Sequence, residues 1–382
     1  MKRIYLDNAA TSFPKAPGVA EAVSEYLLHG CINLYRTESR LIEENFDILY
    51  SLRSMLARLY NYPHPECIAF TKNITEAMNW IIKGLFSKSD HLIVSSNEHN
   101  AVMRPIVECG IAFSRIPSDA TGYNDYSNLE SLIRKETKGI IINAAGNVSG
   151  AVQDLTIPAG IARKHHLHFI VDTAQASPFI DINMEELGIA ALGFTGHKGF
   201  LGPDGTGGML IKKSIAETIP PLIAGGTGTE SDSEDVPHTL PERLSAGTEN
   251  LSGLTGLECA MRYTLERKDE LKERALYLTE RLMEGIRRID GVTIKGADGT
   301  RPRTSVVSIT SPCLDIAEIA SLLLKHGNIE TRVGLHCAPS AHKSLGTFPT
   351  GTLRFSPGPF TTEDEIDTTI EILSDILNQI KG

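Results

Sequence analysis

Residues 190–208 read AALGFTGHKGFLGPDGTGG, and the interpretation of the whole chain starts from this stretch. A short apolar run predicts a buried strand, and a His-Lys pair and five glycines between Gly199 and Gly208 follow it. Backbone this rich in glycine packs tightly, so Lys198 can be held close to a cofactor. Lysine forms a Schiff base with pyridoxal phosphate (PLP), and apolar burial lowers its pKa enough to populate the neutral amine. Most lysines beside glycines lie on solvated turns, so Lys198 alone is weak evidence.

A second stretch, HFIVDTAQ at residues 168–175, predicts another buried strand, and this one ends in an acid. PLP chemistry needs a carboxylate beside the pyridine nitrogen, because the protonated ring accepts the electrons of a substrate carbanion. Open α/β sheets place their ligands at the carboxyl ends of parallel strands, which is where Asp172 falls. By itself Asp172 reads as a helix cap or a turn acid. Together with Lys198 it makes a pair of the kinds that PLP requires.

Seven further motifs accompany VDTAQ and TGHK, and they extend over almost the whole chain. With them the sequence resembles the class V aminotransferases of the fold-type I PLP enzymes, and among these the cysteine desulfurase group related to the Suf and Nif/Isc enzymes. The other motifs are YLDNAATS (5–12), TKNITEAMN (71–79), EHNAV (98–102), GNVSG (146–150), AGTEN (246–250), RVGLHCAP (332–339) and LRFSPGPF (353–360).

The alternation of apolar runs with helical patterns predicts an α/β fold with a mainly parallel sheet of seven strands, covered by helices on both faces. The resemblance implies the fold-type I, aspartate aminotransferase-like architecture, with a large PLP-binding domain at 14–252. It also implies a smaller α+β domain made of 1–13 and 253–382. The expected strands of the large sheet are 67–70, 91–95, 111–114, 139–143, 167–171, 191–194 and 208–211.

Outside that sheet, helical periodicity predicts helices at 43–59, 316–326 and 363–380, and one long amphipathic helix at 253–289. Residues 1–40 are expected to be irregular, and 220–242 to form a long loop rich in Gly, Ser, Pro and acids. Two short strands are expected at 292–295 and 305–310.

The bulk properties of the 382 residues exclude several classes of protein. A formal net charge of −10 argues against a general nucleic-acid binder, which needs clustered Lys and Arg. The start of the chain lacks the apolar core of a signal peptide, and no apolar run is long enough for a membrane span. Six scattered cysteines without CxxC spacing indicate neither zinc nor disulfides, and the histidines at 165, 166 and 168 read as structural, so no metal is expected. We expect a cytoplasmic protein.

The cofactor phosphate is expected at the start of a helix in ITEAMNWIIKGL, because a helix N-terminus offers free N–H groups and a positive dipole end. From the residues alone, Thr75 reads as an ordinary helix cap. The resemblance implies that Ile74 and Thr75 contact the cofactor, and that Thr195 and His197 complete the phosphate site.

The resemblance also assigns residues around the pyridine ring. It implies that His99 stacks on the ring and moves protons during C–S cleavage. Asn147 and Gln175 would hydrogen-bond the phenolic oxygen of the cofactor, and Asn147 would also contact substrate. A lone His or Asn near a strand end is usually structural, so these roles rest on the resemblance.

Arg36 and Thr248 match family positions that reach the active site of a neighbouring subunit. The resemblance therefore implies a homodimer with shared active sites. From the residues alone, Arg36 reads equally well as a surface cation.

Cys337 follows Gly-Leu-His and precedes Ala-Pro. A thiol becomes a strong nucleophile as the thiolate, which nearby cations favour, but an isolated cysteine is more often a small buried hydrophobe. The resemblance implies that Cys337 attacks the sulfur of the bound substrate and carries it away as a persulfide. Many relatives have a second histidine where this chain has Leu335, and this difference leaves the sulfur donor and acceptor open.

Arg354 matches the arginine that binds the substrate α-carboxylate, because a guanidinium–carboxylate pair fixes Cα over the ring. The resemblance as a whole implies a PLP-dependent cysteine desulfurase that converts L-cysteine to L-alanine, with a sulfur-acceptor protein as a further partner. Selenocysteine lyase, cysteine sulfinate desulfinase and another class V reaction such as transamination remain as alternatives. A non-catalytic scaffold with a PLP-enzyme fold is a further alternative, because fold alone does not prove function.

Overall fold

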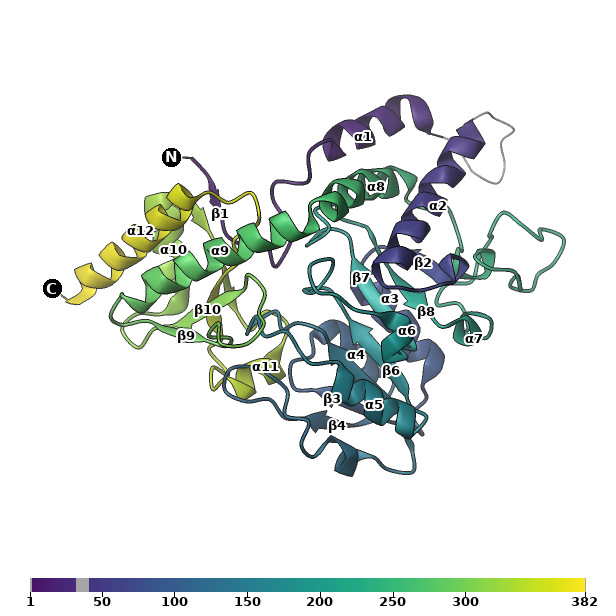
Figure 1. Ribbon diagram of the computed structural model, residues 1–382, viewed down its shortest axis with the longest axis horizontal. Helices are drawn as coiled ribbons and strands as arrows, with labels where there is room; N and C mark the ends of the chain where they lie inside the picture. The colour runs from purple at the N-terminus through teal and green to yellow at the C-terminus, as the bar shows by residue number, and fades with distance from the viewer. Residues whose placement is uncertain (1, 32–40, 382) are drawn as a thin grey trace.

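The computed structural model describes residues 2–31 and 41–381, and a seven-stranded sheet lies at the centre of its larger region (Figure 1). All seven strands predicted for this sheet are present, with ends that differ from the prediction by at most two residues. In their spatial order they are β2 (Ile68–Thr71), β8 (Gly207–Ile211), β7 (Ala191–Thr195), β6 (His168–Asp172), β5 (Thr137–Asn143), β3 (His91–Ser95) and β4 (Ala112–Ile116).

Strand direction decides where the strand ends meet. Strands β7, β6, β5, β3 and β4 are parallel to one another, whereas β8 runs antiparallel between β7 and β2. Strand β2 therefore runs in the same direction as β7. The predicted mainly parallel sheet is confirmed, and the carboxyl ends of six of its strands lie at one edge.

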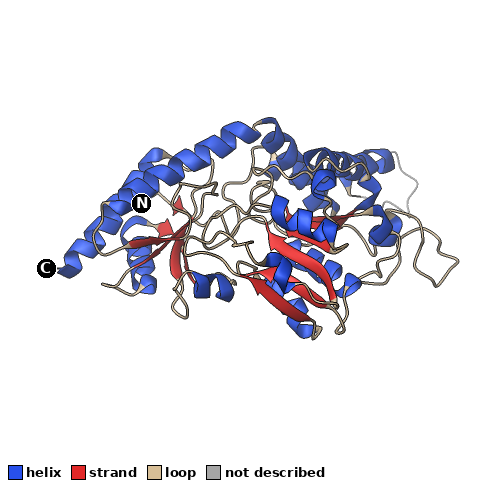
Figure 2. Ribbon diagram, turned by 60° about the horizontal axis from the view of Figure 1, so that its bottom comes forward, coloured by secondary structure: helices blue, strands red, loops and turns tan. Residues whose placement is uncertain are grey.

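Helices lie on both sides of these strands (Figure 2). Strands buried on both faces need continuous apolar sequence, and Ile140, Ile141 and Ile142 in β5 are all fully buried. The helices of this region are α2 (Leu41–Leu59), α3 (Ile74–Leu85), α4 (Asn100–Glu108), α5 (Thr156–Lys164), α6 (Met184–Leu187) and α7 (Lys213–Ala216). Single 3₁₀ turns are η2 (Pro65–Cys67), η3 (Leu129–Leu132) and η4 (Glu242–Leu244).

A second hydrophobic core belongs to the C-terminal part of the chain and to the first strand. Its four-stranded antiparallel sheet has the order β12 (Arg332–Gly334), β13 (Thr352–Phe355), β10 (Val307–Thr310) and β9 (Thr293–Lys295). Beside it, β1 (Ile4–Tyr5) pairs in parallel with β11 (Ile329–Glu330). The helices here are α10 (Ile316–Gly327), α11 (Pro339–Ser344) and α12 (Glu363–Lys381). The exact domain boundaries at residues 13 and 252 stay a prediction.

The prediction of one helix over 253–289 is wrong. The chain forms α8 (Leu251–Glu266) and α9 (Lys268–Arg287), which meet at Arg267, where the backbone has φ −118° and ψ 20°. The two helices bury their apolar faces in different cores: Leu257 lies in the first, and Leu282 in the second. The change of core explains the break, and α8 and α9 link the two regions in Figure 1.

The prediction that the first 40 residues are irregular is also wrong in part. Helix α1 (Val19–Glu25) continues into a π-helix, η1 (Tyr26–Gly30), and α1 packs against α8. Within α1 only Val19 is buried, so the sequence carries too little apolar periodicity to predict a helix.

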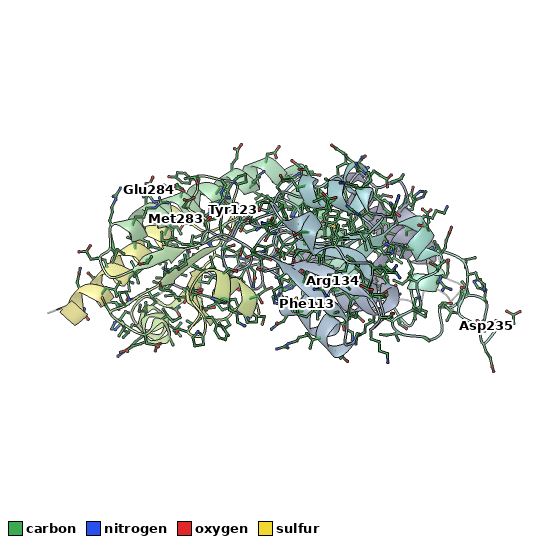
Figure 3. All side chains as sticks on the ribbon, turned by 90° about the horizontal axis from the view of Figure 1, so that it is seen from below. Phe113, Tyr123, Arg134, Asp235, Met283 and Glu284 are labelled. Carbon is green, nitrogen blue, oxygen red and sulfur yellow. The ribbon has the colours of Figure 1, made fainter. Side chains whose placement is uncertain are left out.

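Two further expectations concern the remaining segments. Residues 220–241 form no helix or strand, as predicted, and Asp235 lies at the outer tip of this loop in Figure 3. None of the helices in the described part of the chain is both long and apolar enough to cross a membrane.

Candidate active site

Side chains that the sequence singled out follow neighbouring strand ends at one edge of the large sheet. Asp172 is the last residue of β6, and Lys198 lies three residues beyond β7. His99 follows β3, and Asn147 follows β5. Ligands of open α/β sheets bind at this edge, so the strand order itself assembles the candidate site.

A cavity of about 300 Å³ lies at this edge. Its size is at the lower end of the range of roughly 300–1,000 Å³ that is usual for small-molecule sites. It brings together ten residues of the predicted site, from segments that are far apart in the sequence. They are Ile74, Thr75, His99, Asn147, Asp172, Gln175, His197, Lys198, Cys337 and Arg354.

Lys198 lines this cavity on a loop whose backbone is closely packed. Gly199 lies so close to the chain at Ser177 that an added Cβ would be 2.1 Å from the Ser177 carbonyl oxygen. Burial lowers the pKa of Lys198 to about 8, and Arg354 and Arg332 act in the same direction while Asp172 opposes them. A neutral amine, which Schiff-base formation requires, is thus populated near neutral pH.

Asp172 is buried, with 4% of its surface exposed. Its Oδ1 accepts a hydrogen bond of 2.8 Å from the Ala174 N–H. Burial raises the pKa of Asp172, and the Ala174 N–H and the charge of Lys198 only partly offset this effect. A buried acid of this kind would be stabilised in its ionised form by a further cation, and a protonated pyridine nitrogen is one.

Helix α3 presents its N-terminus to the same cavity. The cap is Asn73, whose Oδ1 accepts from the Glu76 N–H at 3.0 Å, while Glu76 Oε2 accepts from the Lys72 N–H at 2.7 Å. This arrangement is a variant of the capping box, in which Glu76 accepts from the residue before the cap, so the interpretation of Thr75 as the cap is wrong. Thr75 lies inside the helix, and its side chain is exposed at the cavity. A phosphate would meet the free N–H groups and the dipole of this helix end.

His99 caps α4 with its ring. Its Nδ1 accepts a hydrogen bond of 3.0 Å from the Ala101 N–H, so any ring proton of the neutral form is on Nε2. Burial lowers the pKa of His99 to about 4, and Lys198, Arg332 and Arg104 add to the effect. His99 is therefore neutral at physiological pH.

The loop that carries Cys337 is tied to both sides of the cavity. The Asn147 side-chain Nδ2 donates to the main-chain oxygen of His336 at 2.7 Å, and the Asn100 N–H donates to the main-chain oxygen of Cys337 at 2.8 Å. His336 and Cys337 have φ of +46° and +57°, a backbone form that non-glycine residues adopt rarely. The Cys337 thiol is exposed and lies at the cavity.

Three other predicted residues lie at or near the cavity. Gln175 Nε2 donates to the Ala9 oxygen at 2.9 Å, and this bond ties the strand end to the N-terminal segment. His197 Nδ1 lies 3.2 Å from Asp204 Oδ1. Burial lowers the pKa of His197 to about 4. Thr195 is buried at the end of β7 and does not line the cavity, so a direct contact with phosphate stays a prediction.

The roles expected for two further residues stay predictions. Arg36 lies outside the residues that the structure describes. Thr248 precedes α8 and is absent from the cavity wall. Both were expected to act in a neighbouring subunit, and that expectation stays untested.

Sequence reasoning missed several residues of the wall. Arg332 and His336 line the cavity, although neither was predicted as a site residue. Asn73 was missed because Thr75, two residues later, also fits a helix start. The signal was available: Asn73 stands three residues before Glu76, which is the spacing of a capping box.

Unsatisfied polar atoms indicate that the cavity is built for a polar ligand. Asn147 Oδ1, Arg354 Nε and His336 Nδ1 are buried and have no hydrogen-bond partner. A lysine with a lowered pKa, a buried acid and a helix N-terminus surround the same space. This donor set fits PLP: a Schiff-base partner, a partner for the ring nitrogen, and a site for the phosphate.

Comparison with known proteins agrees with this arrangement. The family model "Aminotransferase class-V" matches residues 4–369. A probable cysteine desulfurase of Pyrococcus abyssi is 30% identical over 391 residues, which cover 99% of this chain and 95% of the relative. The cysteine desulfurase IscS of Dictyoglomus turgidum is 29% identical, with 100% and 96% covered.

Solved structures show the same fold over nearly the whole length. The apo cysteine desulfurase of Thermococcus onnurineus superposes with a TM-score of 0.88 at 30% identity, covering 99% of this chain and 95% of that one. The Escherichia coli cysteine desulfurase CsdA, in its S-sulfonic acid form, gives 0.87 at 25% identity, with 98% and 94% covered. The predicted fold-type I architecture is confirmed, and the chain belongs to the class V aminotransferase family.

Proposed function

We propose that this protein is a PLP-dependent cysteine desulfurase, which converts L-cysteine to L-alanine and keeps the sulfur on Cys337 as a persulfide. The observation that carries the proposal is the meeting of Lys198, Arg354 and the exposed thiol of Cys337 around one cavity. Transamination requires the lysine and the arginine, but it has no use for a thiol. The similarity of the whole chain to proteins named cysteine desulfurase supports the same conclusion.

The cofactor would be held from three directions. Lys198 provides the covalent link, Asp172 pairs with the ring nitrogen, and the N-terminus of α3 at Thr75 takes the phosphate. When bound, PLP supplies an electron sink for the bond that breaks at the substrate Cα.

The residues of this chain divide the remaining work. Arg354 binds the substrate carboxylate and so fixes Cα beside Lys198, whose neutral amine accepts the Cα proton. The Cys337 thiolate attacks the substrate sulfur, so that an S–S bond forms while the Cβ–S bond breaks. The electron pair of the broken bond stays on the carbon side, where protonation yields alanine. In sum, one cysteine and one thiol become one alanine and one persulfide, and no external oxidant or reductant is required.

We also propose that the active unit is a homodimer, with Arg36 and Thr248 completing the site of the partner. Leu27, Leu28 and Tyr50 are exposed by 57%, 69% and 68%, and large apolar side chains are common in homodimer interfaces. They belong to η1 and α2, which precede and follow residue 36 in the sequence. A sulfur-acceptor protein and a cytoplasmic location remain parts of the proposal.

The test compares three substrates with and without the thiol. Wild type and Cys337→Ala are given L-cysteine, L-selenocysteine and L-cysteine sulfinate, and the alanine released is measured. A desulfurase loses L-cysteine turnover in the variant and keeps more activity on the other two, whose leaving groups need less nucleophilic help. Turnover of L-cysteine by Cys337→Ala at the wild-type rate would instead assign a lyase or transaminase.

A further inference from the structure

Arg354 has an acidic partner from the other end of the chain. Its Nη2 donates to Asp7 Oδ1 at 2.6 Å. The arginine side chain is 2% exposed and the aspartate 18%, so this ion pair is largely removed from water. Burial lowers the pKa of Arg354, and Asp7 acts against this effect and so stabilises the charged guanidinium.

The position of Asp7 is set by backbone pairing. Asp7 forms a parallel bridge with Ser356, two residues beyond Arg354. The Ser356 N–H donates to the Leu6 oxygen at 2.7 Å, and the Asn8 N–H donates to the Ser356 oxygen at 3.2 Å. The Ala9 N–H adds a bond of 2.9 Å to Ser356 Oγ. Both neighbours of Asp7 are thus fixed to Ser356, the residue that follows strand β13 with Arg354.

In two other arginines of the chain, the guanidinium binds a carboxylate through two of its nitrogens. Arg281 donates to Asp367 through both Nε and Nη2, each at 2.7 Å, and Arg3 holds Glu330 through the same two nitrogens. Asp7 takes only Nη2 of Arg354, and Nε is buried without a partner. The remaining nitrogen, Nη1, donates to the main-chain oxygen of Asn147 at 3.2 Å.

Asp7 also lies outside the cavity wall, whereas Arg354 is part of it. We propose that Asp7 is a positioning residue: it holds Nη2 of Arg354 from outside the cavity wall, and so keeps the guanidinium in place for a carboxylate that enters the cavity. This inference rests on the proposed function, in which the ligand of Arg354 is the α-carboxylate of an amino acid. The N-terminal segment then contributes to amino-acid recognition without touching the substrate.

The experiment uses two unreactive amines that differ only in the carboxylate. L-alanine and ethylamine are titrated into the PLP-loaded protein, and binding is followed by the change in the visible spectrum. Asp7→Ala should weaken L-alanine binding by about tenfold, the effect of losing one hydrogen bond to a charged group. Ethylamine binding should not change, because it does not use Arg354. With L-cysteine, KM should rise more than kcat falls.

Two variants make the result specific. Asp7→Asn keeps an oxygen that accepts from Nη2, so it should retain most of the L-alanine affinity. Asp367→Ala removes the partner of Arg281 at the surface and should change neither titration. Wild-type L-alanine affinity in Asp7→Ala, or an equal loss for both amines, would overturn the inference. If wild type does not prefer L-alanine to ethylamine, the carboxylate role of Arg354 in the proposed function fails instead.

Discussion

The Asn147 side chain donates a hydrogen bond of 2.7 Å to the main-chain oxygen of His336, the residue before Cys337. This bond joins the loop after β5 to the loop that carries the thiol. Its partners are 189 positions apart in the sequence, and both are buried. The thiol position therefore depends on a residue that was expected to contact only the cofactor and the substrate.

Replacing Asn147 should separate thiol placement from cofactor binding. Asn147→Ala removes the bond to His336, and we expect persulfide formation on Cys337 to slow by about tenfold, the effect of one buried hydrogen bond. Cofactor content should fall much less, because Lys198 and Asp172 remain. Single-turnover labelling of Cys337 with L-cysteine, beside cofactor absorbance, measures both. Unchanged labelling would mean that the bond does not place the thiol.

Gly199 should be intolerant of any side chain. An alanine Cβ there would lie 2.1 Å from the Ser177 oxygen, so the lysine loop must shift in Gly199→Ala and cofactor loading should drop sharply. Gly160→Ala is the matched control, because it lies in α5 with no atom within 4 Å of the added carbon. That change should stabilise the fold by about 0.5–1 kcal/mol. Equal loading in the two variants would contradict the packing described for Lys198.

The pH dependence of cofactor loading should follow the ionisation of Lys198. Burial lowers the pKa of Lys198 to about 8, so its neutral amine becomes populated as the pH rises through that value. The loading rate of the apoprotein should therefore increase up to about pH 8 and level off above it. Free lysine would show the rise near its ordinary value of 10.5. Stopped-flow absorbance across this range distinguishes the two, and an inflection near the higher value would contradict the buried site.

The shared dimer site can be tested by mixing defective subunits. Arg36→Ala and Lys198→Ala homodimers should each be inactive. The first lacks the arginine that each subunit supplies to its partner's site, and the second lacks the lysine of each subunit's own site. After subunit exchange, a heterodimer carries one site with both native residues, so up to about half of the wild-type activity per heterodimer should return. Exchange is verified by mass spectrometry of differently tagged chains. Proven exchange without recovered activity would place both residues in the same site.

Sequence patterning predicted the large sheet well because its strands are continuous apolar runs bounded by turns. It predicted Lys198 and Asp172 because each follows such a run at the sheet edge. It failed where contacts between segments far apart in the sequence determine the structure. The helix predicted at 253–289 breaks at Arg267 because its two halves pack into different cores. It also missed Asp7, whose importance comes only from the strand that lies beside it in space.

The central claim is that Cys337 receives the substrate sulfur. PLP-loaded protein is incubated with L-cysteine in the absence of reductant, and its peptides are analysed by mass spectrometry while released alanine is quantified. The account predicts one additional sulfur atom on the peptide with Cys337, in amounts that match the first alanine released, and neither product with Cys337→Ala. Alanine release with no added sulfur on Cys337, or with the sulfur on another cysteine, would contradict it.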